Sequence, residues 1–258
     1  MVLRRIREHV GHQNWFAVGI DFLIVVIGVF LGIQASNWNQ ARVERQQARE
    51  YRSMLSDDVA TNLANMANKK VYYRWVRAEA LATLAALKRP SGELGEQFLI
   101  DAYQASQIQP WAFKRNIYDQ IISVGAIGSL GPPLLRDQVA NYYVGAEVTG
   151  ANIASVPPYR EILRRIMPYA VQQSVRSRCA EKIVQDSRAR TQVLLPGACT
   201  LDLDPQTVRQ AVAQVHDWPE LTLDLNRLLV DLDQKLLSVD TISERAVRLR
   251  ADLAQVDR

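Results

Sequence analysis

The sequence predicts an all-α protein in which one N-terminal transmembrane helix continues into a long helix that packs with a helical bundle. Three observations support this fold class. Residues 16–33 are all apolar or glycine except Asp21. The 57 residues 33–89 contain neither glycine nor proline, the two residues that most often end a helix. Farther along the chain, apolar residues recur at steps of three and four, whereas strand-like alternation is scarce.

The apolar run 16–33 is long enough to cross a lipid bilayer. As a helix it extends about 27 Å, close to the hydrocarbon thickness of a bilayer. Its thirteen Val, Ile, Leu and Phe residues outweigh the cost of Asp21, which is about 3 kcal/mol at the membrane centre. Trp15 and Trp38 flank the run, and we expect them to be interface anchors. A cleaved signal peptide would have a shorter apolar core followed by small residues, so we expect an uncleaved anchor.

The orientation of this helix is set by weaker signals. Arginines lie close to both ends of the run, so the positive-inside rule gives nearly a tie. Cys179 and Cys199 can form a disulfide around a loop of about 20 residues if the domain lies outside the cytoplasm; inside the cytoplasm they would be buried thiols. We therefore expect residues 1–14 to be a short cytoplasmic tail. The C-terminal domain is then periplasmic, and the protein lies in a bacterial inner membrane.

One face of the predicted transmembrane helix carries its special residues. At 100° per residue, Asp21, Gly28, Gly32 and Ala35 lie within about 40° of one line. The Gly-x-x-x-Gly spacing lets two helices approach closely. The sequence therefore predicts association through this face, either with a second copy or with another envelope protein.

The same region carries a family resemblance. Residues 21–40 combine an acidic residue, a Val-Val-Ile-Gly core and the pattern Gln-x-x-Asn-Trp-Asn. The positions concerned are Asp21, Val25, Val26, Ile27, Gly28, Gln34, Asn37, Trp38 and Asn39. They resemble the start of an uncharacterised family of bacterial single-pass inner-membrane proteins, and residues 118–125, 134–136 and 142–143 resemble it more loosely. The resemblance implies a helical membrane protein of unknown function.

The residues beyond the membrane are expected to form one helical unit. Residues 15–38 are the predicted transmembrane helix, 39–90 a long juxtamembrane helix and 91–258 a helical extracytoplasmic domain. The long helix has one apolar stripe, and the asparagine-rich stretch 65–68 is where it could break. The stripe consists of Ala48, Tyr51, Leu55, Val59, Leu63 and Met66.

Turn residues divide the rest of this unit. A short helix is expected at 96–107, followed by two arms, 114–124 and 134–144, around a turn. A longer helix should begin at Pro157 and Pro158 and kink at Pro168. Residues 187–200 look like a loop.

The last part of the chain predicts two helices. Asp204 is a predicted N-cap with Pro205 at the first helical position. The final helix, from about Trp218, has a near-heptad apolar stripe interrupted by Lys235. This stripe either forms a coiled coil or, as we favour, packs within its own bundle. Its members are Leu225, Leu228, Leu232, Val239, Ile242, Ala246, Leu249 and Leu253.

Motifs and charge exclude several functions. The 31 basic and 27 acidic residues leave a net charge of only +4, without the concentrated basic face of a nucleic-acid binder. His9 and His12 precede the membrane segment and His216 stands alone, so no metal site is expected. Phosphate-loop, dinucleotide-binding and metalloprotease motifs are absent from the sequence, so we expect no cofactor and no enzymatic activity.

Two hypotheses for function remain. The first is a membrane-anchored interaction or scaffold protein that binds the lipid bilayer and either itself or another envelope protein. The alternative is a stator-like or sensory membrane subunit in which Asp21 couples to protons or to a partner membrane protein. Whether a small-molecule ligand binds is unknown from the sequence.

Overall fold

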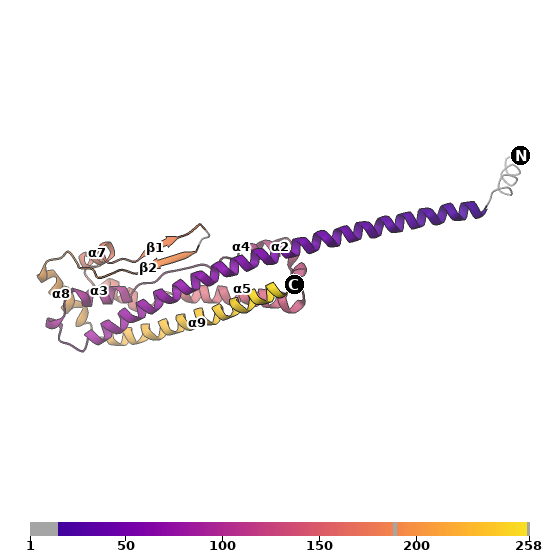
Figure 1. Ribbon diagram of the computed structural model, residues 1–258. Coiled ribbons are helices and arrows are strands. Elements are labelled where there is room, and N and C mark those ends of the chain that lie inside the picture. The colour runs from indigo at the N-terminus through magenta and orange to yellow at the C-terminus, as the bar shows by residue number, and fades with distance from the viewer. Residues whose placement is uncertain (1–14, 188–189, 257–258) are drawn as a thin grey trace, which may run out of the picture. The chain divides into compact units, whose positions relative to one another are not determined.

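The computed structural model describes residues 15–187 and 190–256 of the chain. The chain divides into two compact units, Met1–Glu50 and Tyr51–Arg258. Helix α2 (Trp15–Ala86) begins in the first unit and ends in the second (Figure 1). The described residues are helical apart from turns, extended connections and one small two-stranded sheet, which confirms the all-α fold class.

Helix α2 is unbroken from Trp15 to Ala86. The break that the sequence allows at 65–68 does not occur. Asn65 is buried, and the side-chain amide of Asn68 donates a hydrogen bond to the carbonyl oxygen of Ala64 within the same helix. These amides therefore do not disrupt the backbone, and the helix ends shortly before Pro90.

Three long helices form the core of the second unit: the later part of α2, α5 (Pro133–Ala154) and α9 (Leu221–Gln255) (Figure 1). Their relative directions follow from side-chain pairs. Lys70 pairs with Asp240 and Arg77 with Asp233, so α9 runs antiparallel to α2. Asn152 donates a hydrogen bond to Ser238, and Lys235 donates to the carbonyl oxygen of Ile153.

The apolar stripe of α9 is buried within this bundle. All eight predicted stripe residues are buried, which agrees with packing inside the chain's own fold. Lys235, the interruption, is also buried and donates hydrogen bonds to two carbonyl oxygens at the end of α5, those of Ile153 (2.9 Å) and Ser155 (2.7 Å). The last carbonyls of a helix have no partner within the helix, so this lysine satisfies groups that an apolar residue would leave unpaired.

Shorter elements cover the ends and sides of the bundle. The first of these are η1 (Ser91–Glu93), α3 (Glu96–Ala105), α4 (Asn116–Ser123) and η2 (Ala126–Leu130). The later ones are α6 (Pro158–Ile166), α7 (Tyr169–Arg178) and α8 (Pro205–His216). Asp204 caps α8 as predicted, because its carboxylate accepts hydrogen bonds from the backbone N–H groups of Gln206 and Thr207.

Two local predictions need correction. Pro168 separates α6 from α7 instead of kinking one helix, because it cannot supply the backbone N–H that a continuous helix requires. The predicted loop 187–200 contains strand β2 (Thr191–Leu194), which pairs antiparallel with β1 (Lys182–Gln185). Ile183 is the register partner of Val193. The strands are only four residues long, too short for alternation to reveal them.

Candidate functional site

The apolar part of α2 is exposed. Eleven large apolar side chains between Ile20 and Ile33 are solvent-exposed, including Phe22 at 71% and Ile24 at 62%. The most apolar part of the helix has a mean hydropathy of 2.0, and none of it is buried. By length and composition this helix could span a membrane, and it is the one such helix among the described residues.

The predicted association face lies within this exposed segment. Asp21, Gly28, Gly32 and Ala35 are all exposed. A Cβ atom added to either glycine would meet no atom within 4 Å. The structure therefore leaves this face open for close approach by another helix.

The two predicted interface anchors lie at the ends of the apolar segment. The side chain of Trp38 is 69% exposed, and its role as an interface anchor stays a prediction. The side chain of Trp15 lies outside the part of the chain that the structure describes. The preceding residues, which include His9 and His12, also lie outside it.

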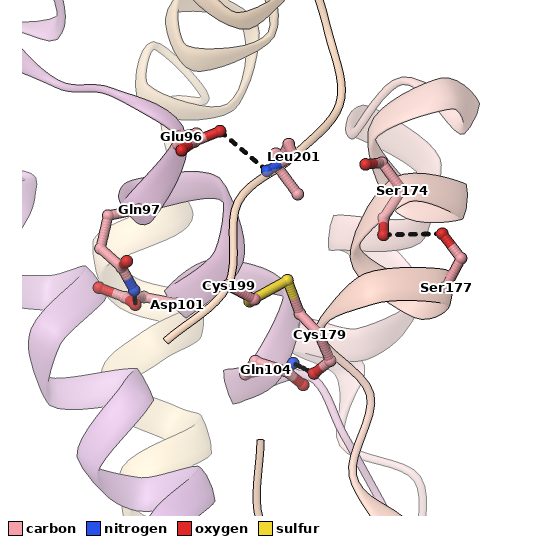
Figure 2. Close-up of a disulfide and its surroundings, with 9 residues drawn as sticks. All are labelled: Glu96, Gln97, Asp101, Gln104, Ser174, Ser177, Cys179, Cys199 and Leu201. Atoms are coloured by element: carbon pink, nitrogen blue, oxygen red, sulfur yellow. Dashed lines mark hydrogen bonds between the residues drawn. A yellow bond between two sulfur atoms is a disulfide. The ribbon is translucent and has the colours of Figure 1, made fainter. Parts of the chain in front are cut away.

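Cys179 and Cys199 are joined by a disulfide (Figure 2), with their Cα atoms 5.6 Å apart. The side-chain amide of Gln104 on α3 donates a hydrogen bond to the carbonyl oxygen of Cys179. Two residues beyond Cys199, the backbone N–H of Leu201 donates to the carboxylate of Glu96, also on α3, at 2.9 Å. The disulfide and these two bonds fasten the end of α7 and the chain leaving the hairpin to the same helix.

A row of buried polar residues on α2 holds the irregular segment between α3 and α4. Asp58, Asn62 and Lys69 lie on one face of α2 and are almost fully buried. The amide of Asn62 donates to the carbonyl oxygen of Lys114 (2.9 Å) and accepts from its N–H (2.8 Å). Asp58 forms an ion pair with the ammonium group of Lys114 at 2.8 Å. These bonds give an extended segment the backbone partners that a helix or sheet would otherwise supply.

Lys69 lies at the other end of this row. Its ammonium group donates to the carbonyl oxygen of Gln109 at 3.0 Å, beside a cleft of about 530 Å³. Burial lowers the pKa of Lys69 to about 7, because the charged form loses its hydration. This row was not predicted from the sequence, although the spacing of its polar residues on one helical face was a visible signal.

A second hollow follows the contact between α5 and α9. This groove has a volume of about 770 Å³, and its apolar rim includes the exposed residues Val144, Val148 and Leu237. At its floor α5 approaches α9 closely, since a Cβ atom on Gly145 would lie 3.1 Å from Cδ1 of Ile242. The groove is formed by two separate stretches of the chain, 138–149 and 234–252, and sequence periodicity gives no indication of it.

Two carboxyl groups meet where α2 contacts α3. The carboxyl groups of Glu79 and Asp101 interact with each other, and the side-chain amide of Gln97 donates a hydrogen bond to Asp101 at 2.6 Å. Burial, followed by the nearby negative charge of Asp101, raises the pKa of Glu79 to about 7. Burial likewise raises the pKa of Asp101. The pair can therefore hold a proton near neutral pH.

The side chain of His216 has two polar partners. His216 contacts the carboxylate of Asp217 at 2.8 Å and the carbonyl oxygen of Arg89 at 3.0 Å. In the described part of the chain, no group of three or more His, Cys, Asp or Glu side chains is placed to hold a metal ion.

Comparison with known proteins finds no family model, curated protein or solved structure that matches this chain. The family resemblance of the membrane segment therefore stays a prediction.

Proposed function

We propose that this protein is a membrane-anchored helical interaction protein of the bacterial envelope. The observation that carries the proposal is the exposure of the eleven large apolar side chains between Ile20 and Ile33. Each would be stabilised by about 1.5–3 kcal/mol on leaving water. A bilayer provides that environment along the whole segment, and an exposed apolar surface of this kind needs a lipid or protein partner.

The disulfide supports a periplasmic location for the second unit. Structural disulfides persist in oxidising compartments and are rare in the cytoplasm. Cys179 and Cys199 both belong to the second unit, so that unit lies on the oxidising side and residues 1–14 lie in the cytoplasm. This arrangement is a proposal about sidedness that cysteine labelling can test.

For the labelling experiment, a single reporter cysteine is introduced at exposed Ser187 or at Glu8 in the N-terminal tail. The native cysteines form a disulfide and do not compete for the reagent. A maleimide that does not cross the inner membrane should label Ser187→Cys in cells with a permeabilised outer membrane. It should label Glu8→Cys only after lysis. The reverse result would overturn the sidedness, and recovery of the protein in the aqueous fraction without detergent would overturn the anchor.

The proposed interaction is self-association through the face that carries Gly28 and Gly32. Its support is that both glycines are open to close approach and that Asp21 and Ala35 share their face. Oxidative cross-linking of Ala35→Cys should give a dimer. Asn37→Cys, which points about 160° away from the line through Asp21, is the matched control and should not.

Gly28→Leu should abolish the Ala35→Cys dimer, because the larger side chain keeps two backbones apart. Equal cross-linking at positions 35 and 37 would show that this face is not the interface. No cross-linking at either position would also exclude it, and co-purification would then ask whether another envelope protein binds the anchor.

A further inference from the structure

Three arginines of the second unit surround one pocket. Arg160 and Arg164 are one turn apart on α6, and Arg176 lies on α7. The pocket has a volume of about 490 Å³, and Tyr103, Gln107, Ala180 and Glu181 form its other walls. The break at Pro168 lets α6 and α7 contribute to the same cavity, which a continuous helix would not allow.

The three guanidinium groups are held by neutral partners. Arg164 lies over the ring of Tyr103, 3.6 Å from its centroid, and donates to the hydroxyl of Ser106 at 3.1 Å. Arg160 donates to the carbonyl oxygen of Ser106 at 2.8 Å. Arg176 donates through Nε to the hydroxyl of Tyr103 at 3.4 Å. These contacts position the three side chains but neutralise none of their charge.

Several other arginines of this unit are paired with carboxylates. Arg77 pairs with Asp233, Arg115 with Asp119, and Arg178 with Asp202. Among the described residues, no carboxylate forms an ion pair with an arginine of the pocket. The three guanidinium groups of the pocket therefore lie together without an ion-paired carboxylate in the described part of the chain, and Glu181 is the one acidic residue of the lining.

The positive charges also act on one another. Burial lowers the pKa of Arg164 to about 10, and the charges of Arg160 and Arg176 contribute in the same direction. Three guanidinium groups and the carboxylate of Glu181 give the lining a formal charge of three positive minus one negative, or +2. A bound dianion would balance this charge and relieve the repulsion.

We propose that this pocket binds a phosphate group, either as hydrogenphosphate or as the terminal phosphomonoester of a small organic molecule. Guanidinium groups match phosphate oxygens with paired hydrogen bonds. The terminal Nη groups of Arg176 donate no hydrogen bond to any described residue, and neither does Nη2 of Arg160. The pocket is larger than a phosphate ion, which leaves room for an organic substituent.

Glu181 adds selectivity to this site. The hydroxyl of Tyr72 donates a hydrogen bond to Oε1 of Glu181 at 3.3 Å. The carboxylate can accept a further hydrogen bond from an O–H group of the ligand. Hydrogenphosphate is a dianion that keeps one O–H group and can donate it to this carboxylate. A phosphomonoester can do so as its monoanion, which is the minor form at pH 7 because its second pKa is about 6, and which balances one of the two positive charges. Sulfate and a phosphodiester headgroup carry no such proton at neutral pH, so the carboxylate would repel them.

The test is calorimetric titration of the full-length protein in a neutral detergent near pH 7. Inorganic phosphate, glycerol 3-phosphate, sulfate and glycerophosphocholine are compared at constant ionic strength. We expect one site per chain for the first two, and affinity at least about tenfold lower for the last two. Tighter binding of glycerol 3-phosphate than of phosphate would identify a phosphomonoester as the source, and the opposite order would identify the free ion. Equal affinity for phosphate and sulfate, or no binding, would overturn the proposal.

Two variants separate a built site from general attraction to positive charge. Arg176→Gln removes an exposed arginine of the pocket and should weaken phosphate binding by about tenfold or more. Arg178→Gln, the same change on the same helix but outside the pocket, should leave it nearly unchanged. Glu181→Gln should raise the affinity for sulfate relative to phosphate, because an amide can donate to sulfate. Equal weakening by the two arginine variants, or no change in selectivity with Glu181→Gln, would contradict the proposed site.

Discussion

The ammonium group of Lys235 on α9 donates a hydrogen bond to the carbonyl oxygen of Ile153, near the end of α5, at 2.9 Å. The side chain of Lys235 is only 1% exposed, so a cation is buried to satisfy the end of a neighbouring helix. Burial lowers its pKa from 10.5 to about 8. The hydrogen bonds of Lys235 connect α9 to the end of α5, but burial disfavours the charged form of the ammonium group that donates them.

Because burial lowers the pKa of Lys235, the free energy of unfolding should change with pH in the alkaline range. Between pH 8 and 10 the unfolded chain holds a proton on Lys235 that the folded chain has released, so the free energy of unfolding should rise with pH. Lys235→Met should reduce this rise. Urea denaturation of the full-length protein in detergent, followed by tryptophan fluorescence from pH 7 to 9.5, measures the slope. Lys70→Met, at a partly exposed ion pair, is the control and should keep the wild-type slope.

Below neutral pH, the carboxyl pair of Glu79 and Asp101 should make the free energy of unfolding fall as pH rises, the opposite of the effect of Lys235. The pKa of Glu79 is about 7 in the folded protein, above the value of 4.5 expected when it is unfolded. The folded state then binds more protons between these values, so stability should fall as pH rises from about 4.5 to 7. Glu79→Gln should flatten this decline in the same urea experiment, whereas the exposed Glu244→Gln should not. An unchanged slope in Glu79→Gln would show that the pair does not share a proton.

Among the polar residues of α2, Asn62 should lose the most free energy of unfolding when it is replaced. Asn62→Ala removes both hydrogen bonds to the backbone of Lys114, which is partly buried, and the bond to the buried hydroxyl of Tyr142. We expect a loss of about 2–3 kcal/mol in the free energy of unfolding. Asn68→Ala, which breaks only a bond within its own helix, should cost well under half of that. Similar costs for the two variants would show that the 107–115 segment does not depend on α2.

The disulfide should stabilise the folded protein through the loop that it closes. Cys179 and Cys199 are 20 residues apart, and closing a loop of this length stabilises a fold by about 3 kcal/mol. Cys199→Ser should lower the urea midpoint accordingly, and adding reductant to the wild type should have a similar effect. Reductant should not affect Cys199→Ser further, and a further loss would indicate damage unrelated to this bond.

Asp21→Asn tests the alternative function. If Asp21 couples to protons or to a partner membrane protein, the neutral amide should abolish that coupling while leaving the protein in the membrane. Growth, membrane assembly and proton leak would be compared between the variant and the wild type in cells. No difference in all three would dispose of the coupling hypothesis and leave the anchor role unaffected.

The sequence by itself determined the features that depend on neighbouring residues. The apolar run 16–33, the uninterrupted helix that follows and the cap at Asp204 all follow from local composition and helix geometry. The near-heptad stripe of α9 likewise predicted which residues are buried. Helical periodicity is a short-range property, and it was enough to establish the fold class.

Only the tertiary structure decided which polar residues meet. Lys235 interrupted the stripe in the sequence, yet it bonds the end of α5, 82 positions earlier in the chain. Arg160 and Arg176 share a pocket with Tyr103 because Pro168 turns the chain between two helices. Such contacts depend on helix packing and on long-range desolvation, and no local pattern encodes either one.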